Sequence, residues 1–391
     1  MSQPVATSIF SNCSTHYDWE IVFEYCTNAT NPCKSVQQIE TSIIIAYVDY
    51  YSSVTLFSIA GLINIYCLLI IIPLYRKMQD GTKKKYIFLI TRCIAGLLTS
   101  CAWLLIQCIY LRFIAPTSGN FPYYVLALAL YIGSTYVLLG SYVGMAAILY
   151  LGVLNPIAFN QYLKLRTVYI AVCVIFLTAI VLSIPLATLQ AAIAIPTASV
   201  KCTDKSCAPL ITLINLILVS GSLLITIISS SFVLISLKRH RKQFKKLDTV
   251  SNTSLNSALR LLSWTLFAEI LISVAEIIPF VFMEYKKHQR STSGCYWFNH
   301  ASRVVSEASF ALIESSIWSI ALIIDPLTNV ILDTTVSKQA TNQIKWARKS
   351  FVGLARNMTG KVSRRRITNG KEMQVCQEEQ IIQLDTISSI T

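Results

Sequence analysis

The sequence predicts an all-α membrane protein, a seven-transmembrane helix bundle with an extracellular N-terminus and a short amphipathic helix after the seventh span. Three observations predict this fold class. Hydrophobic residues make up 54% of the chain and charged residues only 13%, whereas soluble domains carry about 25% charged residues. Seven apolar stretches reach the length of about 20 residues that a helix needs to cross a bilayer. Basic residues gather in the connections on one side of these stretches.

The apolar stretches divide the chain into four predicted segments. The spans are expected at 50–75, 86–111, 123–151, 168–192, 209–237, 259–283 and 305–331, which gives a bundle over 50–331 after an extracellular tail over 1–49. An amphipathic juxtamembrane helix is expected over 332–356, because Ala340, Ile344 and Ala347 fall on one face with Lys345 and Arg348 nearby. The composition of residues 357–391 predicts a disordered cytoplasmic tail.

The basic residues set the predicted orientation. Most of the 33 Lys and Arg residues fall in the first, third and fifth connections and in the C-terminal tail. Basic connections stay in the cytoplasm, so the N-terminus is expected outside the cell. The acidic N-terminal tail carries glycosylation sequons at Asn12 and Asn28, which agree with this orientation. Membrane topology therefore explains the net charge of +14, and no nucleic-acid partner is expected.

Six cysteines fall in the predicted extracellular segments, an oxidising compartment that permits disulfides. They are Cys13, Cys26, Cys33, Cys202, Cys207 and Cys295, and the sequence alone does not choose among their pairings. Cys108, near the outer end of the second span, is a further candidate for this set. Cysteines inside the spans are expected to act as small apolar packing residues. They are Cys67, Cys93, Cys101 and Cys173.

Away from the span ends, five ionisable residues fall inside the predicted spans, where charged side chains usually face the bundle interior and pair. They are Arg92, Glu269, Glu276, Glu314 and Asp325. By depth in the membrane, Arg92 is expected to pair with Asp325 or with Glu276. Such a pair either holds the fold as a static contact or works as a switch that rearranges between two states. The sequence leaves both interpretations open.

Four short motifs follow one another along the spans. The first span contains "GLINIY", the third runs into "AAILYLGVLNPIAFNQY", the sixth contains "AEIIPF" and the seventh "DPLTN". In this order and spacing they resemble landmarks of the G-protein-coupled receptors. The matching residues are Asn64 at the helix-packing asparagine, Tyr150 and Pro156 in the Asp-Arg-Tyr region, Pro279 at the sixth-helix proline, and Asp325-Pro326 at the seventh-helix Asn-Pro.

The sequence also departs from this receptor pattern. Ile148-Leu149 stands in place of Asp-Arg, and Gly96 stands in place of the carboxylate of the second span. No cysteine begins the third span, Glu276-Ile277 replaces Cys-Trp in the sixth, and Asn329 replaces the tyrosine of the seventh. Divergence of this degree resembles the nematode serpentine chemoreceptor families, in which the architecture persists while the motifs drift.

The resemblance implies roles for particular residues. A polar network is expected from Asn64, Arg92, Glu269, Glu276, Asp325 and Asn329. Pro279 and Pro326 are expected to kink their helices, with Asn329 available for a backbone carbonyl that Pro326 frees. The ligand pocket is expected in the outer half of the bundle, at Trp103, Gln107, Tyr131, Tyr136, Gln190, Phe280, Glu314 and Trp318. The expected G-protein contacts are Tyr150, Pro156, Phe159, Lys238, Arg239, Arg241 and Arg260.

The predicted function is a chemosensory-type receptor of the plasma membrane, with a sensory cilium among the candidate locations. It is expected to bind an extracellular small molecule or peptide, to signal through a heterotrimeric G protein, and to contact membrane lipid. The alternative is a ligand-gated channel or transporter with a seven-helix bundle, although the chain lacks the internal repeat typical of transporters. No enzyme activity, cofactor or metal is expected, because the four histidines lie outside the spans without metal-ligand spacing.

Overall fold

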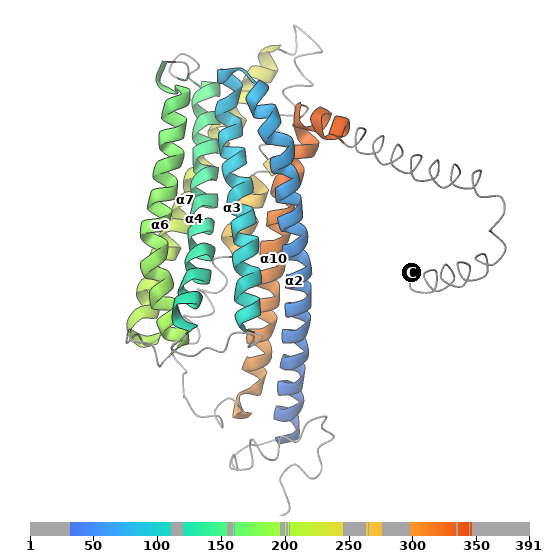
Figure 1. Ribbon diagram of the computed structural model, residues 1–391, viewed down its shortest axis with the longest axis vertical. Helices are drawn as coiled ribbons and strands as arrows, with labels where there is room; N and C mark the ends of the chain where they lie inside the picture. Colours follow the sequence, from blue (N-terminus) through green and yellow to red (C-terminus); the bar gives the residue numbers. More distant parts are fainter. Residues whose placement is uncertain are drawn as a thin grey trace, which may run out of the picture. The chain divides into compact units, whose positions relative to one another are not determined.

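The structure is a computed structural model of the 391-residue chain. It describes residues 32–110, 120–154, 159, 161–195, 200, 202, 204–244, 263–264, 266–275, 298–333, 335–343 and 345. Within these residues the regular structure is helical, with no strand (Figure 1). The six long helices are α2 (Pro32–Lys77), α3 (Asp80–Tyr110), α4 (Phe121–Leu154), α6 (Leu165–Ala194), α7 (Asp204–Phe244) and α10 (Ala301–Leu332).

Each of these six helices is long and apolar enough to cross a membrane. They correspond to the predicted spans one to five and seven. The predicted sixth span, over 259–283, is represented by a shorter apolar helix, Leu266–Ala275, and most of its other residues lie outside the described part. The all-helical membrane architecture is therefore observed, and the seventh crossing stays a prediction.

The first helix is longer than the predicted first span. α2 begins at Pro32, so residues 32–49, which were assigned to the extracellular tail, are helical. This stretch contains no glycine and no proline after Pro32, and proline is well tolerated in the first turn of a helix because its missing N–H has no helical partner there. In Figure 1, α2 and α10 run side by side and extend past α3 at one end.

The helices pack around α4 and α2. α4 contacts α3, α6 and α7, while α2 contacts α3 and α10. One buried apolar cluster brings together Phe57 of α2, Leu138 of α4, Ile272 of the helix Leu266–Ala275 and Trp318 of α10. The short sixth-span helix therefore belongs to the same core as the long helices.

Glycines in α4 allow close contact with its neighbours. A Cβ atom at Gly144 would lie 2.3 Å from Cε1 of Phe88 in α3, and one at Gly140 would lie 2.8 Å from Cγ2 of Ile175 in α6. Both distances are too short for a real contact, so a larger residue at either position would force Phe88 or Ile175 to shift. Small residues serve the same purpose at many transmembrane helix interfaces.

The chain divides into two compact units, Met1–Val336 and Ser337–Thr391. The helix bundle belongs to the first unit. A short helix over 335–343 spans the boundary, within the range 332–356 in which an amphipathic helix was predicted.

Candidate functional site

A buried ion pair joins α3 to α10. Arg92 Nη1 donates a hydrogen bond to Asp325 Oδ1 at 2.8 Å, and the two side chains are 0% and 7% exposed. Of the two partners expected for Arg92, the structure thus pairs it with Asp325, while Glu276 lies outside the described residues. Glu269 is fully buried on the helix Leu266–Ala275, and among the described residues it forms no ion pair with Arg92.

Tyr142 of α4 packs against this ion pair. We call Arg92, Tyr142 and Asp325 the charged layer. The Arg92 guanidinium carbon lies 5.0 Å from the centroid of the Tyr142 ring, and the tyrosine is 1% exposed. A cation over an aromatic face in a desolvated site gains roughly 2 kcal/mol. Because Arg92, Tyr142 and Asp325 come from α3, α4 and α10, the layer ties three helices together; Tyr142 was not anticipated from the sequence.

Asn64 of α2 repairs the backbone of α10. Proline has no N–H, so Pro326 leaves the Leu322 carbonyl without its helical donor. Asn64 Nδ2 donates to Leu322 O at 3.3 Å and to Ala60 O, in its own helix, at 2.9 Å. α10 continues as a helix through Pro326. A kink at Pro326 stays a prediction, and Pro279 lies outside the described residues.

The sequence-based assignment of Asn329 to this carbonyl is wrong. Asn329 Nδ2 instead donates to the Asp325 carbonyl at 2.7 Å. Helical side chains lean back by about one turn toward the helix N-terminus, which brings Asn329 to Asp325. The Leu322 carbonyl lies nearly two turns before Asn329, so only a side chain from another helix reaches it.

Gly96 makes room for the Asn64 amide. A Cβ atom at position 96 would lie 3.0 Å from Asn64 Oδ1 and 3.1 Å from Asn64 Nδ2. Beside this contact, Cys67 Sγ lies 3.7 Å from the Pro326 carbonyl oxygen. The glycine that replaces the second-span carboxylate of the receptor pattern therefore serves a packing purpose: it lets α3 lie against the Asn64 amide, which links α2 to α10.

A second ion pair lies just after α10, and the sequence reasoning missed it. Lys85 Nζ lies 2.6 Å from Asp333 Oδ2, to which the Tyr86 hydroxyl also donates at 2.9 Å. Asp333 Oδ1 accepts the backbone N–H groups of Thr335 at 3.0 Å and of Val336 at 3.4 Å. Asp333 thus caps the helix over 335–343; an aspartate just before a helical stretch is the sequence signal for such a cap.

The charge state of Asp333 follows from these contacts. Burial alone would raise its pKa. The positive charge of Lys85 and the hydrogen bonds from Lys85, Tyr86 and the Val336 backbone outweigh burial and hold the pKa of Asp333 below its usual value. The carboxylate is therefore ionised at neutral pH.

Three of the predicted pocket residues meet in an aromatic layer. Trp103 of α3 lies between Phe57 of α2 and Tyr131 of α4, with ring centroids 5.3 Å and 5.5 Å apart. Tyr131 in turn lies 6.1 Å from Trp318 of α10, which is 1% exposed. We call Phe57, Trp103, Tyr131 and Trp318 the aromatic layer.

The other predicted pocket residues are more dispersed. The Tyr136 hydroxyl donates to Asn215 Oδ1, which links α4 to α7. Gln107 and Glu314 are half-buried, whereas Gln190 is exposed. Phe280 lies outside the described residues. Of the predicted pocket residues, the structure thus brings Trp103, Tyr131 and Trp318 together.

The predicted G-protein contacts are described only in part. Tyr150 packs edge-on against Phe232, with centroids 6.2 Å apart, and Lys84 Nζ lies 4.2 Å from the Phe159 ring centroid. Lys238, Arg239 and Arg241 belong to the last turns of α7. Pro156 and Arg260 lie outside the described residues.

The cysteines that the structure describes divide as expected, with one correction. Cys202 and Cys207 form a disulfide, and Cys33 is disulfide-bonded as well. Cys108 is free, so its assignment to the disulfide set is wrong, and the four span cysteines are also free. The remaining candidates, Cys13, Cys26 and Cys295, lie outside the described residues together with both sequons at Asn12 and Asn28.

Comparison with known proteins identifies relatives along most of the chain, although no family model matches it. A Caenorhabditis elegans protein named as a presumptive G-protein coupled receptor-like protein is 67% identical over 367 residues, covering 94% of this chain and 98% of the relative. A C. elegans protein named as a presumptive G-protein coupled receptor is 36% identical over 337 residues, covering 85% of this chain and 91% of the relative. Another with such a name is 38% identical over 275 residues, covering 70% and 87%. The chain therefore belongs to this family of divergent, serpentine-type G-protein-coupled receptors, whose class of function is signal transduction across a membrane.

Proposed function

We propose that the chain is a chemosensory-type receptor of the plasma membrane that binds an extracellular small molecule or peptide and signals through a heterotrimeric G protein. Its relatives' names support the receptor class. The observation that carries the proposal is the buried Arg92–Asp325 pair beside Pro326. Ionisable residues inside a membrane are costly to bury and usually mark function.

The spacing of residues couples the two layers. Trp318 and Asp325 are seven residues apart in α10, so they share one helix face about 10 Å apart. Trp103 and Arg92 are eleven residues apart in α3, about three full turns, and also share a face. A ligand that displaces Trp103 or Trp318 therefore displaces the charged layer through two continuous helices. In this mechanism the ion pair is the switch, and its two states differ in which contacts Arg92 makes.

The direct test is expression of the full chain in cells that report G-protein dissociation and calcium, screened against a chemical library. A ligand response is expected that disappears when the G protein is removed. Trp103→Phe is expected to shift the half-maximal ligand concentration while surface expression stays at the wild-type level. A ligand-dependent current that persists without any G protein would overturn the proposal in favour of a channel.

The orientation is tested separately. Glycosidase treatment is expected to increase the gel mobility of the wild-type chain and to leave Asn12→Gln/Asn28→Gln unchanged. The sequons at Asn252 and Asn357 provide the control, because the proposed topology keeps them in the cytoplasm and unmodified. Glycan attached at either of these two asparagines would contradict the proposed topology.

A further inference from the structure

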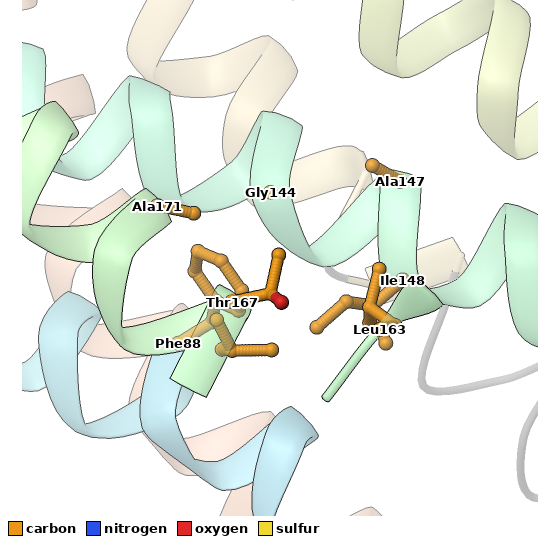
Figure 2. Close-up of a pocket in the computed structure, with 8 residues that line it drawn as sticks. Phe88, Gly144, Ala147, Ile148, Leu163, Thr167 and Ala171 are labelled. Atoms are coloured by element: carbon orange, nitrogen blue, oxygen red, sulfur yellow. The ribbon is translucent and has the colours of Figure 1, made fainter. Parts of the chain in front are cut away.

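A cavity of about 120 Å³ lies between α3, α4 and α6, and none of its lining residues belongs to the charged or the aromatic layer. Figure 2 shows Phe88 of α3 beneath it, Gly144, Ala147 and Ile148 of α4 along one wall, and Thr167 and Ala171 of α6 along the other. Ala147, Thr167 and Ala171 are exposed, so the cavity opens on the surface of the bundle. We call this cavity the α4–α6 groove.

The lining of the groove is hydrocarbon. Among its lining residues only Thr167 has a polar side chain, and the Thr167 hydroxyl already donates to the Tyr162 carbonyl at 3.3 Å. Apolar cavities of about 150 Å³ stay dry and take up a molecule such as benzene. A cavity of this size and chemistry therefore accepts a few methylene groups and offers a polar ligand nothing to bind.

The groove lies near the N-terminal end of the membrane-capable stretch of α6. Thr167 and Ala171 fall in the first turns of the membrane-capable stretch Leu165–Ile193. Directly before and within the first turn, Lys164 and Arg166 are exposed, and neither forms an ion pair with another described residue. Ala171 is seven residues beyond Lys164, which corresponds to about 10 Å along the helix. An acyl chain reaches that depth from a headgroup held at the level of Lys164.

We propose that the α4–α6 groove binds one acyl chain of an anionic phospholipid whose headgroup lies on Lys164 and Arg166. The apolar lining selects the chain, and the two cations select the negative charge of the headgroup. A sterol also suits an apolar groove, but it carries no anionic group for the two cations. The proposal requires the membrane-spanning bundle only and does not depend on receptor activity or ligand.

The choice of variants follows from packing. Gly144 is unsuitable as a site for filling the groove, because a Cβ atom there would overlap Phe88 in the folded protein. Ala171 and Ala147 stand at the exposed mouth, where a larger side chain extends into the groove or the membrane. Ala171→Phe and Ala147→Phe, on different helices, are two independent ways to fill it.

The experiment is native mass spectrometry of the purified full chain in detergent, with phosphatidylserine, phosphatidylcholine or cholesterol added in turn. Wild type is expected to retain one phosphatidylserine more tightly than phosphatidylcholine. Ala171→Phe and Ala147→Phe are expected to weaken its binding about tenfold or more, because each excluded methylene group forfeits its burial. Lys164→Gln and Arg166→Gln are expected to weaken it by roughly fivefold each.

Two matched controls accompany these variants. Cys173→Phe places the same benzyl side chain at an exposed position of α6 outside the groove lining. Arg76→Gln/Lys77→Gln removes two exposed cations from the end of α2. Both are expected to bind phosphatidylserine as wild type does, and the unfolding temperature of each variant establishes that it is folded.

Three outcomes would overturn the proposal. In the first, a folded groove-filling variant binds phosphatidylserine as tightly as wild type. In the second, wild type retains phosphatidylcholine as tightly as phosphatidylserine, which removes the role of the cations. In the third, cholesterol is the lipid that binds and that the filled variants lose, which assigns the groove to a sterol.

Discussion

The charged layer and the aromatic layer share the helices α3, α4 and α10, and the aromatic layer adds Phe57 of α2. In each layer a tyrosine of α4 lies against one residue of α3 and near one of α10: Tyr142 with Arg92 and Asp325, and Tyr131 with Trp103 and Trp318. The two tyrosines are eleven residues apart, as are Arg92 and Trp103 in α3. The bundle thus repeats one arrangement at two depths.

The two layers are expected to differ in how well they tolerate substitution. An ion pair in an apolar interior is specific, because removing one partner leaves a buried charge with nothing to compensate it. Stacked aromatic rings are less demanding, since a smaller ring keeps most of the buried area. The charged layer therefore depends on both partners being present, whereas the aromatic layer tolerates a smaller ring.

The largest expected effect is the loss of one charge. Arg92→Ala or Asp325→Ala is expected to lower the free energy of unfolding by about 3–5 kcal/mol, because the remaining charge is buried and unpaired. The reversed pair Arg92→Asp/Asp325→Arg is expected to recover part of this loss, as measured by thermal unfolding of the purified protein.

An apolar replacement is the control for this pair. Arg92→Met/Asp325→Leu removes both charges, and its stability is expected to lie within about 1–2 kcal/mol of wild type. If the reversed pair is no more stable than either single variant, Arg92 and Asp325 do not stabilise each other. The charged layer would then not owe its specificity to this ion pair.

A smaller effect is expected at Asn64. Asn64→Ala removes the only side chain that donates to the Leu322 carbonyl among the described residues, and leaving a buried carbonyl unpaired costs about 1–3 kcal/mol. Pro326→Ala restores a backbone N–H at position 326. Asn64→Ala is therefore expected to cost less in the Pro326→Ala background, and equal costs in the two backgrounds would show that Asn64 does not repair the helix.

The Lys85–Asp333 ion pair is expected to contribute less than the Arg92–Asp325 pair. The Lys85 side chain is 27% exposed, whereas the Arg92 side chain is fully buried. Asp333→Asn is expected to cost about 1 kcal/mol at neutral pH through the loss of the ion pair. Because the pKa of Asp333 is lowered from its usual value of 3.8, this stabilisation is fully present above that value and disappears as the pH falls through the lowered pKa.

Unfolding temperatures measured from neutral to acidic pH test this sign. The gap between wild type and Asp333→Asn is expected to stay constant down to about pH 5 and to close below pH 4. Asp80→Asn is the matched control. Asp80 Oδ1 lies 2.9 Å from Lys83 Nζ, and the Asp80 side chain is 74% exposed. A gap that widens in acid would contradict the assignment.

The smallest effect is expected in the aromatic layer. Trp318→Phe keeps an aromatic ring, and the Nε1 group it removes has no hydrogen-bond partner among the described residues. The expected loss is below about 1.5 kcal/mol, measured by the same unfolding assay. A loss as large as that of Asp325→Ala would show that the aromatic layer is as specific as the charged one.

Composition and charge were sufficient to predict much of the fold. Hydropathy located five of the six long helices, with ends that differ from the observed ones by at most seven residues, because burial in hydrocarbon demands apolar composition. It placed the start of α2 too late for the same reason: residues 32–49 mix polar and apolar side chains, and hydropathy reports the membrane boundary rather than the end of the helix.

The candidate site was predictable where charge alone decides the partner. Arg92 had few counter-charges at its depth, and Asp325 was one of two considered. Asn64 and Tyr142 were different, because their contacts depend on the rotation of α2 and α4 about their own axes. Asp333 lay outside every predicted span, so the search for charges inside the membrane passed over it.

The length of α2 has a mechanical consequence. A helix of 46 residues is about 69 Å long, more than twice the hydrocarbon thickness of about 30 Å. Some 48 Å of continuous helix separates Pro32 from Asn64. Over this length α2 lies beside α10, and the Ser315 hydroxyl donates to Asp49. A sideways displacement of about 4 Å at Pro32, which corresponds to a tilt of about 5° about Asn64, therefore moves α10 together with α2 and reaches the helix that carries Asp325.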